Sequence, residues 1–203
     1  MLQYDNEQII DWMEGVRKHP DMVNAFWPSQ INSKNWLCDW VKSYLPSANR
    51  IIIFGSWYGV LADMLKIKLP KSQIMCVDKD KEPLLWSARK HAYWHGDMVT
   101  FEYDTRVDLV INTVTEHLTQ EIYNKWYENI PKGTYFVIQG NNDYKEPDHV
   151  RAVQTLDEFN RINRVENILH TDSIQYEGPW DTVDNKPTYY ERYMTIGFKS
   201  EHN

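Results

Sequence analysis

The sequence predicts an α/β fold, with a mostly parallel sheet, helices on both of its faces, an antiparallel C-terminal strand hairpin and an N-terminal helical extension. From residue 50 onward, short runs rich in β-branched residues alternate with helical patterns. That order is typical of parallel sheets covered by helices. Near the C-terminus two strand-like segments follow each other without a helix between them, which indicates an antiparallel pair.

The first segments are helical. Apolar residues recur at helical spacing over residues 6–17 and 33–44, and Pro46 ends the second helix. Residues 20–29 connect the two helices. We expect residues 1–48 to form an N-terminal helical extension that packs on a main domain of residues 49–203, as one compact unit.

The main domain then alternates between strands and helices. Pro83 suits the first turn of a helix, and Pro131-Lys132-Gly133 closes another. Strands are predicted over residues 51–54, 74–77, 99–103, 109–112 and 135–139. Helices are predicted over residues 59–65, 82–92, 120–127 and 155–162. The closing strands are predicted over residues 167–176 and 192–199, with a polar loop at 177–187 between them.

The composition is that of a folded protein with one core. The chain has 203 residues, including nine Trp, thirteen Tyr and six Phe, and a formal net charge of −7. This length suits one domain. The acidic balance and the lack of a visible Lys/Arg cluster argue against binding to duplex DNA.

Cysteine usage and hydropathy suggest a cytoplasmic protein. Cys38 and Cys76 belong to no CxxC pair, so we interpret both as reduced core thiols. The N-terminus is polar and acidic, unlike a signal peptide. No apolar run approaches the roughly 18 residues that a membrane-spanning helix needs.

The strongest local signal is a strand, a glycine turn and a helix, followed by a second strand that ends in an acid. Ile51–Phe54 meets a turn bracketed by Gly55 and Gly59, and Asp78 ends the next apolar run. Such a turn lets a ligand approach the backbone, and the acid is placed to accept hydrogen bonds from two ribose hydroxyls. The alternatives are a tight turn between core elements and an acid that caps a helix, although Asp80 fits the cap better.

The turn lacks the middle glycine of the phosphate-binding GxGxxG pattern and the Gly-Lys-Ser/Thr of a Walker motif. A ligand without phosphates is therefore favoured. The segments Ile53-Phe54-Gly55-Ser56-Trp57-Tyr58-Gly59, Val77-Asp78 and Asp108-Leu109-Val110-Ile111-Asn112-Thr113, with the closing strand pair, resemble a class I S-adenosylmethionine (SAM)-dependent methyltransferase with a Rossmann-like fold. The resemblance covers about residues 50–199.

This resemblance implies SAM as the cofactor. The residues it places at the cofactor are Phe54, Gly55, Ser56, Trp57, Tyr58, Gly59, Asp78, Lys79, Tyr103, Asp104, Asn112, Ser33 and Lys34. The chain departs from the family at the first strand, where Ile53 and Phe54 stand in the region of the usual acid. Asp5, Asp97, Asp104 and Glu116 are candidates to replace that acid.

More narrowly, the chain resembles small methyltransferase-like proteins of bacteriophages and bacteria. The segments that carry this resemblance are Asn112-Thr113-Val114-Thr115-Glu116-His117, Gln139-Gly140-Asn141-Asn142 and Gln30-Ile31-Asn32-Ser33-Lys34-Asn35-Trp36-Leu37. For a phage-encoded chain, the location would be the host cytoplasm. Phage virion partners or a homo-oligomer are then further expectations.

Glu116 and His117 follow the fourth predicted strand, on the side of the sheet where parallel folds place their sites. A neutral His117 could take a proton from the hydroxyl or amine that receives the methyl group. Glu116 could orient His117 or bind the substrate, and Asn112 is the third catalytic candidate. The alternative is that Glu116 caps a helix while His117 packs beneath a loop. Asn141, Asn142 and Tyr144 are candidate substrate contacts, and Asn-Asn-Asp equally suits a turn.

His91 and His95 are four residues apart and could share a helix face, but a pair alone is too few ligands, so no metal site is expected. Methyl transfer is an in-line displacement that needs alignment, water exclusion and proton removal rather than a protein nucleophile. Since the Asn-Pro-Pro-Tyr motif of DNA amino-methylating enzymes is absent, we expect a small molecule or a protein side chain as acceptor.

Two competing functions remain open. The first is a catalytically inactive methyltransferase fold that serves as a binding or structural module, for instance in a phage particle. The missing first-strand acid favours it, whereas Asp78 and the Asn112–His117 cluster favour the enzyme. The second is a nucleotide-binding oxidoreductase, against which the missing GxGxxG pattern counts.

Overall fold

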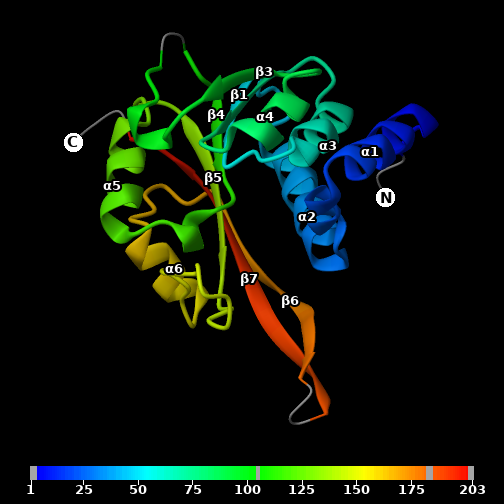
Figure 1. Ribbon diagram of the computed structural model, residues 1–203. Helices are drawn as coiled ribbons and strands as arrows, with labels where there is room; N and C mark the ends of the chain where they lie inside the picture. Colours follow the sequence, from blue (N-terminus) through cyan, green and yellow to red (C-terminus); the bar gives the residue numbers. More distant parts are fainter. Residues whose placement is uncertain (1–3, 104–105, 182–184, 201–203) are drawn as a thin grey trace.

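The computed structural model describes residues 4–103, 106–181 and 185–200. These residues form one seven-stranded sheet with helices on both faces (Figure 1). The strands are β1 (Arg50–Phe54), β2 (Gln73–Asp78), β3 (Ala92–His95), β4 (Leu109–Asn112), β5 (Tyr135–Asn141), β6 (His170–Asp181) and β7 (Lys186–Phe198). The α-helices are α1 (Asn6–Lys18), α2 (Pro28–Tyr44), α3 (Val60–Lys68), α4 (Lys81–Ser87), α5 (Gln120–Asn129) and α6 (Leu156–Ile162), and the 3-10 helices are η1 (Pro20–Phe26), η2 (Met98–Thr100) and η3 (Thr115–His117).

The strand order is β3-β2-β1-β4-β5-β7-β6. The first five strands are parallel, β7 runs antiparallel to β5, and β6 runs antiparallel to β7. The predicted α/β sheet with its closing antiparallel pair is therefore confirmed. Parallel pairing aligns the carboxyl ends of β1, β2, β4 and β5, and these ends are where ligands bind in open sheets.

Alternation along β1 divides the core between two faces of the sheet. Ile51 and Ile53 pack with residues of α1 to α4, such as Leu37, in one buried cluster. Ile52 and Phe54 belong to the other cluster, with residues of α5 and α6. Because every residue of β1 after Arg50 is buried, the run reads as continuous rather than alternating in hydropathy.

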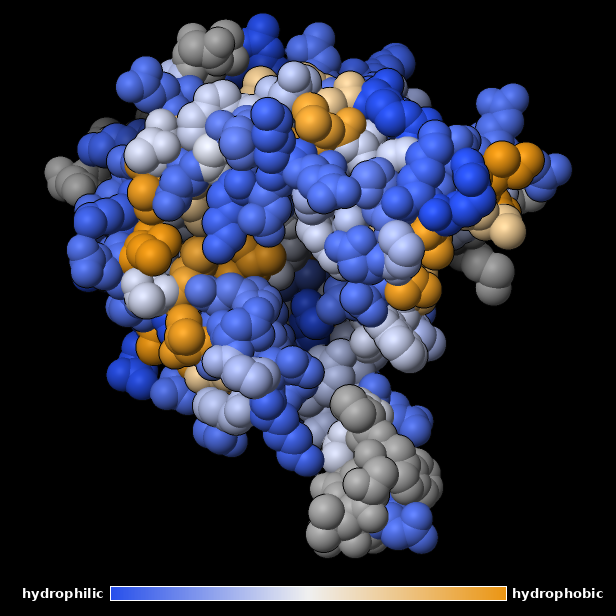
Figure 2. All heavy atoms as spheres, in the orientation of Figure 1, coloured by the Kyte–Doolittle hydropathy of each residue, from blue (hydrophilic) through white to orange (hydrophobic). Residues whose placement is uncertain are grey.

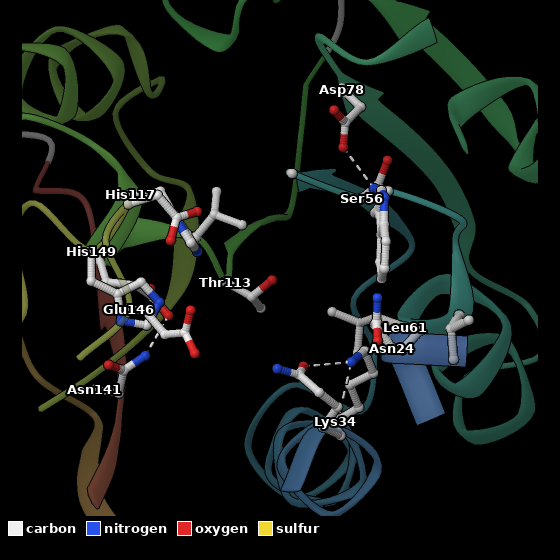
Figure 3. A pocket seen from close by; sticks show the side chains of 18 of the residues that line it. Asn24, Lys34, Ser56, Leu61, Asp78, Thr113, His117, Asn141, Glu146 and His149 are labelled. Atoms are coloured by element: carbon white, nitrogen blue, oxygen red, sulfur yellow. Dashed lines mark hydrogen bonds and ion pairs between the residues drawn. The ribbon is translucent and has the colours of Figure 1, made fainter. Parts of the chain in front are cut away.

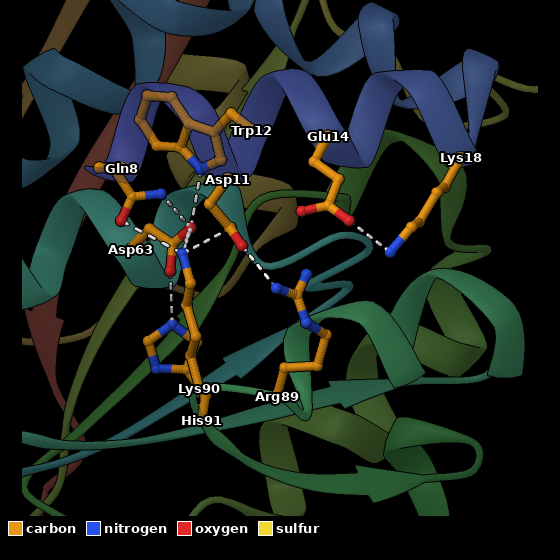
Figure 4. Close-up of polar contacts among 9 residues, drawn as sticks. All are labelled: Gln8, Asp11, Trp12, Glu14, Lys18, Asp63, Arg89, Lys90 and His91. Atoms are coloured by element: carbon orange, nitrogen blue, oxygen red, sulfur yellow. Dashed lines mark hydrogen bonds and ion pairs between the residues drawn. The ribbon is translucent and has the colours of Figure 1, made fainter. Parts of the chain in front are cut away.

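A polar network fixes α1 to α3 and to the segment before β3 (Figure 4). The buried Asp63 of α3 accepts hydrogen bonds from Trp12 Nε1 at 2.7 Å and Gln8 Nε2 at 2.9 Å, both from α1. His91 Nε2 lies 2.8 Å from the same carboxylate, and Lys90 Nζ lies 3.4 Å from it. A buried carboxylate is tolerated only with such partners, so Asp63 ties α1, α3 and the segment before β3 together.

The prediction for the third strand was wrong. Residues 99–103 do not form a strand: Asp97 accepts a hydrogen bond from Val99 N and caps η2 instead. The predicted helix over residues 82–92 ends at Ser87, and after a turn at 88–91 the strand β3 pairs with β2 from Met75 to Asp78. The exposed edge position of β3 explains why its sequence carries a weak strand signal.

The predicted loop over residues 177–187 is mostly strand. β6 and β7 pair as far as Asp181 and Lys186 and project from the body of the molecule as a long arm (Figure 1). Backbone pairing between β6 and β7 forms the strands in this polar segment. The sequence therefore lacks the alternation of apolar and polar residues from which a strand is predicted. The second helix also begins earlier than predicted, at Pro28 rather than at residue 33, because proline suits a first helical turn.

Candidate active site

A cavity of about 1500 Å³ opens at the carboxyl ends of β1, β2, β4 and β5, between α2 and the base of the β6–β7 arm. Figure 2 shows a hollow on this face with mostly hydrophilic residues around it. Its lining includes residues of the glycine turn and of β2 on one wall, and residues after β4 and β5 on the other (Figure 3). The sheet therefore brings the two predicted groups of site residues to a single cavity.

The glycine turn is built for close backbone approach. Gly55 has a left-handed φ of 66°, and a Cβ atom added there would lie 2.6 Å from Val114 Cγ2. Gly59, with φ 76°, is the N-cap of α3, and a Cβ there would lie 2.5 Å from Ser87 Cβ. Only glycine meets both the dihedral and the space requirement at these positions. Both glycines of the motif thus have a structural reason.

Asp78 ends β2 beside this turn. Its Oδ2 accepts a hydrogen bond from Trp57 N at 2.7 Å, and its Oδ1 accepts one from Asp80 N at 3.0 Å. Burial raises the pKa of this carboxyl, although the two N–H donors act in the opposite direction. Each oxygen keeps a lone pair for a further donor. The carboxylate is thereby oriented at the cavity wall, as a ribose-binding acid requires.

Lys34 of α2 forms a third part of the lining. Its Nζ donates to Gln30 Oε1 at 2.9 Å, and the side chain lies close enough to Arg192 for their charges to interact. Burial, with the Arg192 charge as a smaller cause, lowers the pKa of Lys34 to about 7. Two cationic groups at one place favour a carboxylate or another anion as their ligand.

The opposite wall carries Glu116 and His117 of η3. Glu116 is buried, and its Oε1 accepts a hydrogen bond from Asn141 Nδ2 at 2.6 Å. His117 is exposed, and its Nδ1 lies 3.0 Å from Asp148 Oδ2. The ring of His149 packs against that of His117, with centroids 4.7 Å apart. Glu116 is thus not a helix cap. Its carboxylate binds Asn141 at the end of β5 and does not orient His117.

The predicted residues that line the cavity are Gly55, Ser56, Trp57, Tyr58, Asp78, Lys79, Lys34, Glu116, His117 and Asn141. Other predicted residues lie behind this lining. Asn112 is fully buried and accepts a hydrogen bond from Val114 N through Oδ1. Phe54 and Tyr103 pack in the core, and Ser33 donates to Gln139 Oε1. These four support the walls from beneath.

Two further predicted substrate residues lie apart from the cavity lining. The side-chain Oδ1 of Asn142 accepts from Glu191 N, so it joins β5 to β7, and Tyr144 is half exposed. Asp104 lies outside the described residues. Of the other acids proposed to replace the first-strand acid, Asp97 lines the cavity, whereas Asp5 caps α1 at its first turn.

The premise of a helical His91–His95 pair was wrong. α4 ends at Ser87, so His91 lies before β3 and His95 lies on that strand. His91 contacts the carboxylate of Asp63, and His95 Nε2 contacts the carbonyl of Lys79. The two histidines contact different groups, so they do not form a common set of metal ligands.

Sequence reasoning missed several lining residues, above all His149 and Arg192. His149 lies 32 positions after His117 in a segment without a helix or strand, and Arg192 lies within the β7 strand. No spacing rule connects such positions, because the fold alone brings them to the cavity. A cluster of polar residues after β5, at 141–149, was the only sequence signal near His149.

No protein-family model matches the sequence, and no curated protein does. Solved structures do match in fold. TehB from Haemophilus influenzae superposes with a TM-score of 0.60 at 12% identity, over 80% of this chain and 60% of its own, so the chain spans about three fifths of that protein. The plantazolicin methyltransferase BpumL, solved with a triazolic desmethylPZN analog and SAH, gives 0.57 at 14% identity, over 93% and 94%.

N-methyltransferase NodS from Bradyrhizobium japonicum WM9 gives a TM-score of 0.58 at 11% identity, over 83% of this chain and 96% of its own. At such identities the likeness shows the fold. The chain therefore has the Rossmann-like fold of SAM-dependent methyltransferases, as its sequence predicted. In the described part of the chain, no helix is both long and apolar enough to cross a membrane.

Proposed function

We propose that the protein is a SAM-dependent methyltransferase that acts on a small molecule or a protein side chain. One observation carries the proposal: a single cavity joins the Asp78 turn to the wall of Glu116 and His117. Its volume of about 1500 Å³ exceeds the roughly 300–1,000 Å³ of a usual ligand pocket. It therefore has room for a cofactor and an acceptor together.

The residues of the first wall fit SAM. Asp78, oriented by Trp57 N and Asp80 N, would accept hydrogen bonds from the ribose hydroxyls. The left-handed Gly55 allows the backbone to approach the ligand. Lys34 and Arg192 would bind the carboxylate of the amino-acid part of SAM. This contact would anchor that end of the cofactor in a chain whose first strand has no acid.

When bound, SAM supplies the methyl group on an activated sulfur. The chain's own task is to hold the acceptor against the second wall and exclude water. Asn112 supports this wall by fixing the turn at Val114, and Asn141 fixes Glu116. His117, at the cavity surface, is the sequence-based candidate for the base that removes the acceptor's proton.

The finer expectations are part of the same proposal. Residues 1–48 would act as an extension whose Lys34 completes the cavity of the 49–203 domain. Cytoplasmic location, the bacteriophage resemblance and its virion or homo-oligomer partners stay predictions. The intact second wall gives the inactive-module alternative no support.

Calorimetric titration with SAM and with S-adenosylhomocysteine (SAH) tests the cofactor. We expect micromolar binding by the parent, a loss of at least tenfold in Asp78→Ala, and unchanged binding in Asp157→Ala, which removes an exposed acid of α6. Release of SAH with a panel of acceptors then tests turnover. Folded protein that binds neither ligand would overturn the proposal, and binding without turnover on any acceptor would favour a binding module.

A further inference from the structure

Three side chains with metal-ligating atoms converge on the second wall of the cavity. Glu116, His117 and His149 each contribute one such atom, and these atoms lie within 4.8 Å of one another. Glu116 and His117 come from η3, whereas His149 comes from the segment between β5 and α6. Figure 3 shows His117 and His149 side by side, with Asn141 and Glu146 beneath them.

The remaining atoms of these side chains are already held by the protein. His149 Nδ1 lies 2.7 Å from the carbonyl of Asp143, and a carbonyl can only accept, so this nitrogen carries the proton. His117 Nδ1 lies 3.0 Å from the Asp148 carboxylate, which likewise favours a proton there. In both rings Nε2 is left with a free lone pair. Histidines that bind metals are held in this way, by a carbonyl or carboxylate at the other nitrogen.

Glu116 provides the second, independent indication. The residue is 3% exposed, and while Oε1 accepts from Asn141, Oε2 has no hydrogen-bond partner among the described residues. A buried polar atom without a partner loses its hydration without compensation, and the loss is greater when the atom is charged. Such atoms are rare unless a water or an ion satisfies them.

The surrounding charges also favour a cation. Besides Glu116, the cavity lining includes Asp143, Glu146 and Asp148, which follow β5, and Glu177 of β6. The cationic residues that face it are Arg192, in the lining, and Arg151, whose backbone N donates to Glu116 O and whose charge interacts with the Glu116 carboxylate. Carboxylates therefore outnumber cationic groups around the cluster, and a divalent ion would reduce their mutual repulsion.

We propose that Glu116 Oε2, His117 Nε2 and His149 Nε2 form a site for a divalent transition-metal ion such as Zn²⁺. Two imidazoles and one carboxylate suit such an ion, and three protein ligands leave a position open for another molecule. Ligands about 2.1 Å from a tetrahedral ion lie about 3.4 Å apart. One ligand atom of each side chain already lies within 4.8 Å of the others. The longest separation would therefore shorten by up to about 1.4 Å on binding, and the exposed His117 has room to move.

This site gives the proposed methyltransferase a substrate class, and this step rests on the proposed function. The open position would hold a hydroxyl oxygen of the acceptor, and the ion would lower the pKa of that hydroxyl. Its proton passes to solvent, and the oxygen electron pair forms the new bond to carbon as the carbon–sulfur bond of SAM breaks. His117 then acts as a ligand rather than as the base.

Titration of the metal-free full chain with Zn²⁺, and with Co²⁺ as a spectroscopic probe, tests the site without SAM. We expect one ion per chain and visible Co²⁺ absorption bands of a histidine-containing site. The variants His117→Ala and His149→Ala should each weaken binding at least tenfold. His95→Gln, at an exposed histidine of β3, is the matched control and should leave binding unchanged.

Circular dichroism and an unfolding curve confirm that each variant is folded. His117→Ala is the safer variant because the side chain is exposed, and Asp148→Asn, which changes only the partner of His117 Nδ1, should weaken binding about tenfold by the same logic. Absence of one-to-one binding, or binding that His117→Ala and His149→Ala leave unchanged, would overturn the site. SAM titration of the same proteins is scored separately, so failure of the metal site and failure of the proposed function are distinguishable.

Discussion

Lys34→Met should change how the stability of the protein depends on pH. Lys34 is half-buried in the cavity wall, and the loss of solvation lowers its pKa from 10.5 to about 7 in the folded chain. Below pH 7 both the folded and the unfolded chain hold the proton, so the full cost of the buried charge opposes folding. Between pH 7 and 10.5 the unfolded chain binds more protons, so the Lys34 contribution makes the parent more stable as pH rises.

The difference between the two pKa values corresponds to about 5 kcal/mol, at 1.36 kcal/mol for each pH unit. Methionine keeps most of the volume and cannot carry the charge, but it loses the hydrogen bond to Gln30 Oε1, a loss of about 1 kcal/mol. At pH 6 the variant should therefore be more stable than the parent by about 4 kcal/mol, within a factor of two. The difference should shrink steadily as pH approaches 10.5.

Urea unfolding of parent and variant at pH 6, 8 and 10 measures this difference directly, because the other titrating groups are common to both proteins. Lys42→Met, at an exposed position of the same helix, is the control and should show no pH-dependent difference. A Lys34→Met variant that is less stable than the parent at pH 6, or a difference in stability that grows with pH, would show that the Lys34 charge does not destabilise the folded chain.

Two further substitutions test how the site is held. Gly55→Ala should destabilise the fold by about 2–4 kcal/mol, from left-handed strain and overpacking on Val114; Val114→Ala should recover the overpacking part when the two are combined, and additive losses in urea unfolding would contradict this contact. Asp63→Asn should destabilise the fold by about 3 kcal/mol, because the amide keeps only one acceptor oxygen for the donors that share this carboxylate and loses the charge that faces Lys90. The exposed Asp39→Asn should cost less than about 1 kcal/mol, and equal losses at the two positions would contradict the burial argument.

The parts of the fold that could be predicted are those decided by residues close together in the sequence. The β-branched run before Gly55, the acid at Asp78 and the alternation that follows are each decided within a few residues. β3 was misplaced because it is a strand of four residues that lies mostly exposed at the sheet edge, whereas residues 99–103 carry the longer β pattern. Edge pairing with β2 and the Asp97 cap decide that region.

The candidate site divides in the same way. Gly55 and Asp78 follow from motif order, and Glu116 and His117 follow from their place after a strand. The roles of other residues depend on tertiary contacts: Asn112 and Ser33 turn inward, and His149 reaches the cavity from a segment without regular structure. Distances between side chains from different elements, such as those to His149, cannot be read from sequence spacing.

The most direct test of the central claim is a crystal structure of the protein grown with SAH. We expect SAH in the cavity, with its ribose hydroxyls on the Asp78 carboxylate, its carboxylate near Lys34 and its sulfur facing the wall of Glu116, His117 and His149. Density for SAH at another place, or a ligand in the cavity with Asp78 bonded only to the turn N–H groups of Trp57 and Asp80, would contradict this claim.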